Sequence, residues 1–321
     1  MLAERALRTT FTLLQRPAPA LAARLAQRLF FTPPRPRTSA RVEAILKGGR
    51  RIDLTEGRTR IAAWSWGQGP TVYLVHGWAG MGGQLGAFVA PLVEQGFRVV
   101  TFDGPGHGHS GGRRASIVHF ARALSAVARV FGPAHGIVAH SLGGPSAAFA
   151  MKHQGLETGR IVLLAPPADP GDWSQLFAAR LGISARTMES MRTRSERWLG
   201  VSWEQVSLTA LGGGQATPAL VVHDVEDREV PFTHGAAVAA AWPGARLVET
   251  TGLGHRRLLR DQAVVAQVAS FIAAAPAGLP ARPGAFAGGC LTGLASLERY
   301  LDDRESRWST GFPHPPVQAL L

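Results

Sequence analysis

The sequence contains very little cysteine and comparatively little acidic charge. Its single cysteine, Cys290, excludes an internal disulfide and fits a reducing compartment. The chain has 22 acidic residues against 34 lysines and arginines, so its formal net charge is +12. The excess is uneven, because eleven basic residues between Met1 and Arg51 face only Glu4 and Glu43. Such a segment could meet nucleic acid, an anionic membrane or an acidic partner, but no nucleic-acid motif accompanies it, and we expect no nucleic-acid partner.

The chain also lacks an uninterrupted apolar run long enough to span a membrane. The stretch 61–93 carries no Asp, Glu, Lys or Arg, but glycines interrupt it, and we interpret it as buried strand, loop and helix. The N-terminus has no compact apolar signal core followed by a small-residue cleavage site, although its arginine-rich, acid-poor composition also fits a transit peptide. We therefore expect a cytoplasmic protein, with peripheral membrane contact as an open alternative.

Hydrophobic residues make up 45% of the 321 positions, which is enough for one large core. From Arg51 onward, short β-branched runs alternate with helical segments, a pattern typical of a parallel sheet covered on both faces. The first two strands are expected to pair antiparallel around the Glu56–Gly57 turn. The predicted strands are Arg51–Leu54, Arg60–Trp66, Thr71–Val75, Phe97–Phe102, Gly136–His140, Ile161–Ala165, Ala219–Val222 and Arg246–Glu249, and the predicted helices include Gln84–Gln95, Ser116–Phe131 and one after Ser141.

Three segments depart from this alternation and suggest a division of the chain. Residues 1–42 form a basic N-terminal segment and linker, 43–275 the main domain, and 276–321 a C-terminal extension with one helix near 291–301. Within the main domain, residues of about 170–217 are helical in composition and rich in aromatic side chains. An insert of this kind between two strands predicts a small helical lid over a pocket, with a plain packing insert as the alternative.

The N-terminal segment reads as two short helices separated by Pro17 and Pro19, followed by a proline-rich linker at Phe31–Ser39. Each helix carries an apolar stripe at helical spacing. The stripes and the arginines favour reversible contact with an anionic membrane, whereas packing on the main domain is the alternative. The stripe residues are Leu7, Phe11, Leu14, Leu21, Leu25 and Leu29.

The segment IVAHSLGGPS (Ile137–Ser146) places Ser141 between an apolar strand and a small-residue helix start. A nucleophile elbow requires small residues two positions before and after the serine, because the turn is tight. Here those residues are Ala139 and Gly143, and Ala139 departs from the usual G-x-S-x-G by one methyl group. A serine at such a position is otherwise a helix cap.

Asp227 and His255 follow Ser141 in the order acid, then histidine, and each comes after a predicted strand. The carboxyl ends of parallel strands gather at one edge of a sheet, so these residues are expected to meet. Asp224 and Glu226 are competing acids. His107 and His109 form an H-x-H that could suggest a metal, but the neighbouring Gly-Pro-Gly favours a loop. We expect neither a metal nor a cofactor.

These segments together resemble the α/β-hydrolase superfamily over about residues 50–275. The resemblance implies a mostly parallel sheet with helices on both faces, Ser141 as nucleophile and His255 as base. It selects Asp227 over Asp224, because the acid of the family stands three residues before V-P. It also implies an oxyanion hole made by the backbone N–H groups of Trp78 and Leu142. The segments that carry it are VYLVHGW (Val72–Trp78), FDGPGHGHS (Phe102–Ser110), AHSLGG (Ala139–Gly144), HDVEDREVP (His223–Pro231) and GLGH (Gly252–His255).

The function that this reading predicts is hydrolysis of an ester with an apolar acyl or alcohol group, as in a carboxylesterase or lipase. The reaction would pass through an acyl-enzyme on Ser141. Thioesterase, amidase, peptidase and acyltransferase activities remain alternatives, as does a non-catalytic binding protein of the same fold. Dehalogenase or epoxide hydrolase chemistry would need a carboxylate where Ser141 stands. The oligomeric state stays open.

Overall fold

The computed structural model describes residues 2–274. Cys290, the helix predicted near 291–301 and the rest of the C-terminal extension lie outside the described residues. Within residues 2–274 the strands form one eight-stranded sheet in the order β1-β2-β4-β3-β5-β6-β7-β8. The pairs β1–β2 and β2–β4 are antiparallel, and the remaining pairs are parallel. The strands are β1 (Arg50–Glu56), β2 (Thr59–Trp66), β3 (Thr71–Val75), β4 (Arg98–Phe102), β5 (Ala134–His140), β6 (Ile161–Leu164), β7 (Ala219–Asp224) and β8 (Arg246–Thr250).

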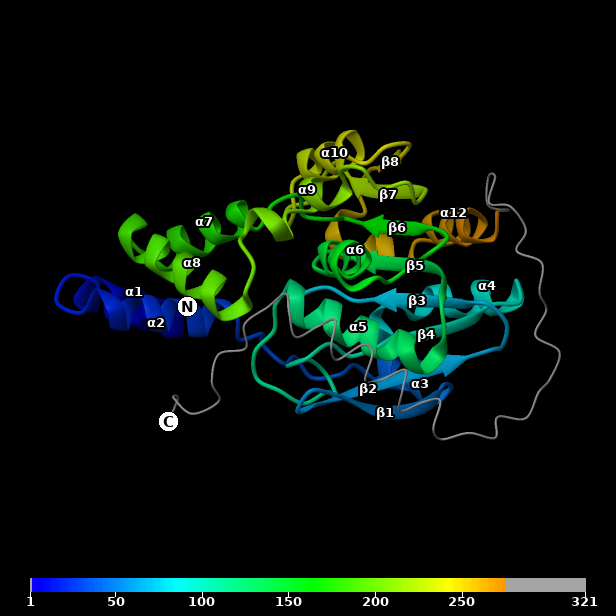
Figure 1. Cartoon of the computed structure of the whole chain (residues 1–321), viewed down its shortest axis with the longest axis horizontal. Helices are drawn as coiled ribbons and strands as arrows, with labels where there is room; N and C mark the ends of the chain where they lie inside the picture. The colour runs from blue at the N-terminus through cyan, green and yellow to red at the C-terminus, as the bar shows by residue number, and fades with distance from the viewer. Residues whose placement is uncertain (1, 275–321) are drawn as a thin grey trace. The chain divides into compact units, whose positions relative to one another are not determined.

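Helices cover both faces of the sheet, as the fold class predicted from the sequence requires (Figure 1). Successive residues of a strand point to opposite faces. In β3, Tyr73 and Val75 pack against one helical layer, and Val72 and Leu74 against the other. The first layer holds α5 (Ile117–Phe131), α6 (Gly143–Gln154), α9 (Leu208–Gly212) and α10 (Phe232–Ala241); the second holds the 3-10 helices η1 (Gly82–Phe88) and η3 (Leu258–Arg260), α4 (Val89–Glu94) and α12 (Gln262–Ala273).

The helix predicted at Gln84–Gln95 is one of the places where the structure differs in detail. The segment begins as the 3-10 helix η1 and turns into α-helix only at Val89. Three of its first seven residues are glycines, Gly82, Gly83 and Gly86, which favour an α-helix poorly. The three glycines also lie in close contact with Thr101, Val42 and Ile45 of neighbouring elements.

The N-terminal helices pack against the insert of residues 170–217. Helices α1 (Leu2–Leu14) and α2 (Pro19–Phe30) lie beside α7 (Pro170–Leu181) and α8 (Ala185–Leu199), and the four helices form a group beyond the sheet, which we call the cap (Figure 1). The insert also contains the 3-10 helix η2 (Glu204–Val206). Of the six predicted stripe residues, Leu7, Phe11, Leu14, Leu25 and Leu29 join the apolar cluster of the cap.

Five of the stripe residues thus pack on the main domain, which is the alternative to membrane contact, and they do so on its insert. Their partners there are Leu181, Ile183, Met191 and Trp203. Leu21 does not join them and remains 54% exposed. Within residues 2–274, none of the helices combines the length and apolar character that a membrane crossing needs. Peripheral contact of residues 1–42 with an anionic membrane stays a prediction.

The linker predicted at Phe31–Ser39 forms no helix or strand, and it leads into α3 (Ala40–Lys47). Ser39 caps this helix, because its side chain accepts a hydrogen bond from the N–H of Val42. Helix α3 contacts η1, the element that follows β3 and its loop. The boundary drawn at residues 42 and 43 thus falls inside α3.

Candidate active site

Ser141 lies on the sharp turn between β5 and α6. Its φ is 51°, a left-handed conformation that is strained for any residue with a side chain. A Cβ at Gly143 would lie 2.5 Å from the carbonyl oxygen of Val75, so only glycine fits there without a shift. Ala139, where the sequence departs from G-x-S-x-G, is fully buried and pairs with Val75 and Leu163 in the sheet. The extra methyl group of alanine is therefore accommodated at this position.

His255 and Asp227 are brought together from two loops that follow neighbouring strands. Asp227 follows β7, and His255 lies in the short helix α11 (Gly254–Arg257) after β8. His255 Nδ1 donates a hydrogen bond of 2.8 Å to Asp227 Oδ2. Both residues are buried, with 8% of His255 and 7% of Asp227 exposed. The carboxylate thus fixes the tautomer that leaves Nε2 of His255 as the basic nitrogen.

Further contacts keep the Asp227 carboxylate ionised. Its Oδ1 accepts hydrogen bonds from the N–H groups of Glu229 and Val230, at 2.8 and 2.9 Å. Its Oδ2 lies 3.5 Å from Nε2 of His223, which donates to the carbonyl of Val230. Burial alone would raise the pKa of Asp227, but the contacts with His223, His255 and Val230 outweigh it and hold the pKa well below the usual range. The sequence pattern did not predict this contact of His223 with Asp227. The contact depends on the turn after β7, which folds Asp227 back toward His223.

Asp224, the competing acid, has different partners. Its Oδ1 accepts from the N–H of Glu226, and its Oδ2 accepts from Thr250 Oγ1 and from the N–H of Leu253, at 2.8 and 2.9 Å. Asp224 therefore ties the end of β7 to the loop that carries His255, without contacting the imidazole. The side chain of Glu226 is exposed.

Ser141 and His255 line the same cavity, which has a volume of about 520 Å³. The structure contains no hydrogen bond between these two side chains, and catalytic contacts of this kind often tighten only when substrate binds. The insert contributes several apolar residues to the cavity wall. These are Trp173, Leu199, Val201, Trp203 and Val206.

The backbone N–H groups of Trp78 and Leu142 have no hydrogen-bond partner within the described residues, and both residues line the cavity. Leu142 precedes the first turn of α6, where unpaired N–H groups and the helix dipole favour negative charge. A Cβ at Gly77 would lie 2.8 Å from that of Ser141, so glycine permits the loop after β3 to approach the serine closely. The arrangement offers two donors to a developing oxyanion.

Comparison with known proteins identifies the family of the chain. A family model described as alpha/beta hydrolase fold matches residues 70–243. The chain belongs to this α/β-hydrolase family. Over 44 residues, which are 14% of this chain and 17% of the relative, it is 52% identical to a pimeloyl-[acyl-carrier protein] methyl ester esterase of Methylococcus capsulatus. The match thus spans far less than two thirds of that relative.

Solved structures show the same fold at low sequence identity. A putative lipase from Acinetobacter baumannii is 17% identical, with a TM-score of 0.56 over 74% of this chain and 97% of that one. An esterase from Exiguobacterium antarcticum is also 17% identical, with a TM-score of 0.54 over 70% of this chain and all (100%) of that one. The family model confirms the predicted superfamily, and these structures agree with the predicted fold class.

The two histidines of the H-x-H motif have different hydrogen-bond partners. His107 Nε2 accepts the N–H of Ala79 at 3.0 Å, and its Nδ1 donates to the carbonyl of Pro105. Burial and the nearby ring of His76 lower the pKa of His107 to about 3, so the ring is neutral and can accept. His107 thereby supports the loop that carries Trp78. Within residues 2–274 no three His, Cys, Asp or Glu side chains are placed to hold a metal.

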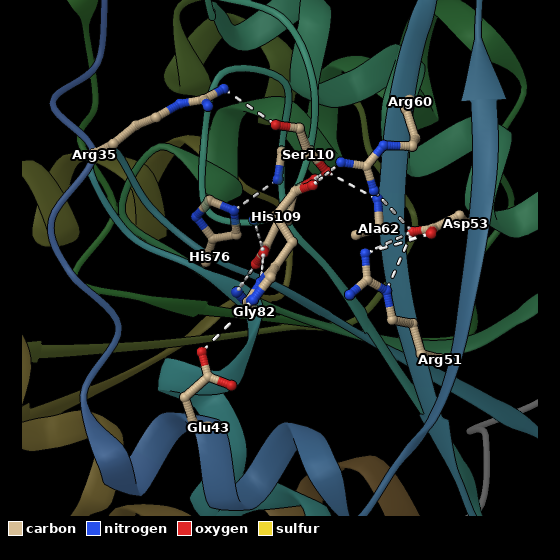
Figure 2. Close-up of polar contacts among 12 residues, drawn as sticks. Arg35, Glu43, Arg51, Asp53, Arg60, Ala62, His76, Gly82, His109 and Ser110 are labelled. Atoms are coloured by element: carbon tan, nitrogen blue, oxygen red, sulfur yellow. Dashed lines mark hydrogen bonds and ion pairs between the residues drawn. The ribbon is translucent and has the colours of Figure 1, made fainter.

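Asp103 organises the second half of that motif. Its Oδ2 accepts from the N–H and from Nδ1 of His109, at 2.7 and 3.0 Å, and its Oδ1 accepts from the N–H of Gly82 at 2.8 Å. The hydrogen bond to Asp103 raises the pKa of His109 above its ordinary value. Nε2 of His109 lies 3.6 Å from Glu43 of α3 (Figure 2). The loop after β4 is thus joined both to η1 and to the N-terminal part of the chain.

His76 and His140 shape the surroundings of the elbow. His76 Nε2 accepts from the N–H of Gly104 at 2.8 Å. His140 Nε2 donates to the carbonyl of His255 at 3.0 Å and so holds the backbone of α11. Burial, together with the charge of a protonated His255, lowers the pKa of His140 to about 3. A neutral ring at this position adds no charge next to His255.

Proposed function

We propose that the chain is a serine hydrolase that cleaves an ester, or a closely related acyl bond, through an acyl-enzyme on Ser141. The observation that carries the proposal is the 2.8 Å hydrogen bond between Asp227 and His255 at a cavity that also contains Ser141 in its strained conformation. A carboxylate, a histidine and a serine in these roles form the constellation of serine hydrolases.

The first half of the reaction transfers the acyl group to the enzyme. Nε2 of His255 takes the proton of Ser141 Oγ as this oxygen bonds to the carbonyl carbon. The N–H groups of Trp78 and Leu142 hold the resulting oxyanion. The carbon–oxygen bond to the alcohol then breaks, and His255 returns its proton to the departing alcohol. Asp227 stabilises the imidazolium throughout, because it accepts from Nδ1.

The second half releases the acid. His255 removes a proton from water, whose oxygen attacks the acyl carbon, and the tetrahedral intermediate collapses when the bond to Ser141 Oγ breaks. Ser141 regains a proton from His255, and the product leaves as a carboxylic acid. No residue outside Ser141, His255, Asp227 and the two backbone donors is needed for these steps.

The apolar wall of the cavity supports a substrate with an apolar acyl or alcohol group, which makes a carboxylesterase or lipase-like activity our first choice. We further propose that the insert of residues 170–217 acts as a lid, since its side chains line one side of the cavity. The name of the Methylococcus relative specifies an ester hydrolase, in agreement with an ester substrate. Thioesterase, amidase, peptidase, acyltransferase and non-catalytic binding functions are the alternatives.

Labelling with a fluorophosphonate tests the nucleophile. We expect the native chain to be labelled, Ser141→Ala to be unlabelled, and Ser125→Ala to be labelled like the native chain. Ser125 is the matched control, because it lies on α5 and bonds to Gln154 away from the cavity. Undiminished labelling of Ser141→Ala would place the nucleophile elsewhere. A native chain that neither reacts nor hydrolyses any of a panel of p-nitrophenyl esters would favour the binding function.

A further inference from the structure

One side of the catalytic cavity is built by the N-terminal part of the chain, before the first strand. We call residues 30–45 the arm. The sequence predicts only a linker at Phe31–Ser39 in this part of the chain, yet side chains of the arm share the cavity with Ser141 and His255. The arm residues that line it are Phe30, Phe31, Ser39, Arg41, Val42 and Ile45.

Hydrogen bonds fasten the arm to the loop after β4. The guanidinium of Arg35 donates to three carbonyl oxygens, those of Gly106 at 2.8 Å, Ser110 at 3.1 Å and Gly112 at 2.8 Å. The carbonyl of Phe31 accepts from the N–H of Ala115 at 2.9 Å. Figure 2 shows Arg35 directed at Ser110, with Glu43 near His109 on the same loop. These contacts give the arm a defined position in spite of its irregular backbone.

Packing brings the C-terminal part of the arm against η1, the helix that follows the loop with Trp78. A Cβ at Gly83 of η1 would lie only 2.7 Å from Val42 Cγ1, so α3 and η1 are in close contact there. Leu46, one turn further along α3, is buried with Ala62 and Trp64 of β2. Val42 is thus held between η1 and the cavity by a helix that is itself anchored on the sheet.

Aromatic rings join the start of the arm to the insert of residues 170–217. Phe30 stacks on Trp203 with ring centroids 5.8 Å apart and meets Phe177 edge-on at 5.2 Å. Phe31 packs edge-on against Trp198 of α8 at 5.2 Å. Contacts of this geometry stabilise a fixed arrangement of the rings. Phe30 and Phe31 of the arm therefore line the cavity together with Trp203 of the insert.

We propose that the arm is the part of the substrate site that binds the apolar group of the ester and sets the largest group that the enzyme accepts. The inference rests on the proposed function, because it assigns a task within that same cavity. An apolar pocket discriminates between groups by size, since a group that is too long is rejected sterically and a shorter one leaves contacts unmade. Val42 and Ile45 are well placed to set such a limit, as both are fixed by their own helix.

The test changes the size of the cavity from the arm side. The measured quantity is kcat/KM for a long p-nitrophenyl ester divided by kcat/KM for p-nitrophenyl acetate. Val42→Trp should lower this ratio by at least about tenfold when the long ester is the decanoate. Val42→Ala should raise the ratio when the long ester is longer than the decanoate. Ala44→Trp is the matched control, because Ala44 lies on the same helix, is exposed and does not line the cavity. Its ratio should equal that of the native chain. A parallel series of butyrate esters of linear alcohols extends the measurement to the alcohol side.

Two further measurements separate the possible failures. Thermal unfolding shows whether Val42→Trp folds, and if it does not, the Val42→Ala comparison decides alone. Fluorophosphonate labelling reports on Ser141 independently of chain length. A native chain that is not labelled and hydrolyses no ester contradicts the proposed function. Labelled, folded variants whose length preference matches that of the native chain in both ester series would overturn the role of the arm and leave the proposed function standing.

Discussion

A hydrogen bond of 2.8 Å joins Asp227 Oδ2 to His255 Nδ1, although the two residues are 28 positions apart in the sequence. Asp224, only three positions before Asp227, bonds instead to Thr250 and to the N–H of Leu253. The two carboxylates therefore hold the same histidine in different ways. One contacts its ring, and the other contacts the loop that carries it.

We expect Asp227→Asn to lower kcat by a factor of order 10⁴, the penalty for the corresponding change in a serine protease, because the imidazolium loses its counter-charge and its tautomer changes. Asp224→Asn should lower kcat much less and should mainly reduce the free energy of unfolding, by about 1–3 kcal/mol, since buried hydrogen bonds are lost. Steady-state kinetics and chemical denaturation of both variants check this. If Asp224→Asn proved the more damaging to kcat, Asp227 would not be the acid.

The close approach of Gly77 to Ser141 predicts a second effect on turnover. A methyl group at Gly77 would lie 2.8 Å from Ser141 Cβ and would displace the loop that presents the N–H of Trp78. We expect Gly77→Ala to reduce kcat by about 10²–10³, the cost of one misplaced oxyanion donor. Gly213→Ala is the control, because its added Cβ would find no atom nearer than 3.7 Å. Equal rates for the two variants would contradict the assigned donor.

Buried neutral histidines predict how stability depends on pH. Burial lowers the pKa of His107 and His140 to about 3 each, and that of His119 to about 4, from an ordinary value of 6.5. Their folded-state pKa values are depressed, so the stability that they contribute is fully present above pH 6.5 and is lost as the pH falls toward 3 or 4. The melting temperature should therefore fall steadily below pH 6.5.

His119 allows this to be tested apart from catalysis, because its ring lies on α5 and bonds to Ser116. In His119→Gln the melting temperature should change less with pH between 6.5 and 4 than in the native chain. If the melting temperatures of the two proteins fell equally with pH across that range, the buried neutral ring of His119 would not be a cause of the pH dependence. Circular dichroism melts at half-unit pH steps are sufficient.

The cap carries the exposed apolar side chains that the predicted membrane contact would need. Leu13 is 70% and Leu21 is 54% exposed, among the arginines of α1 and α2. We expect the protein to co-sediment with anionic vesicles at low salt, less so at high salt, and not with neutral vesicles. Replacing both leucines by serine should weaken the binding. A native protein that stays in the supernatant with anionic vesicles at low salt would disprove the contact.

Sequence alone determined the features that depend on short stretches of chain. The elbow at Ser141 is contiguous, since its tight turn needs small neighbours at fixed positions, here Ala139 and Gly143. The strands of a sheet that is covered on both faces are apolar throughout. A continuous apolar run such as Thr71–Val75 is therefore enough to locate a strand in the sequence. The family motifs extended this reading to the fold as a whole.

Tertiary structure decided which distant surfaces meet. An apolar helical stripe predicts that one face of the helix is buried, but it does not identify the partner. Only the tertiary structure shows that Phe11 and Leu25 pack against the insert. The turn after β7 determines that Asp227, and not Asp224, reaches His255, because a displacement of a few ångströms decides a hydrogen bond. The sequence also did not predict that Val42 lines the cavity. Its position depends on contacts between α3 and η1, which are some forty residues apart in the chain.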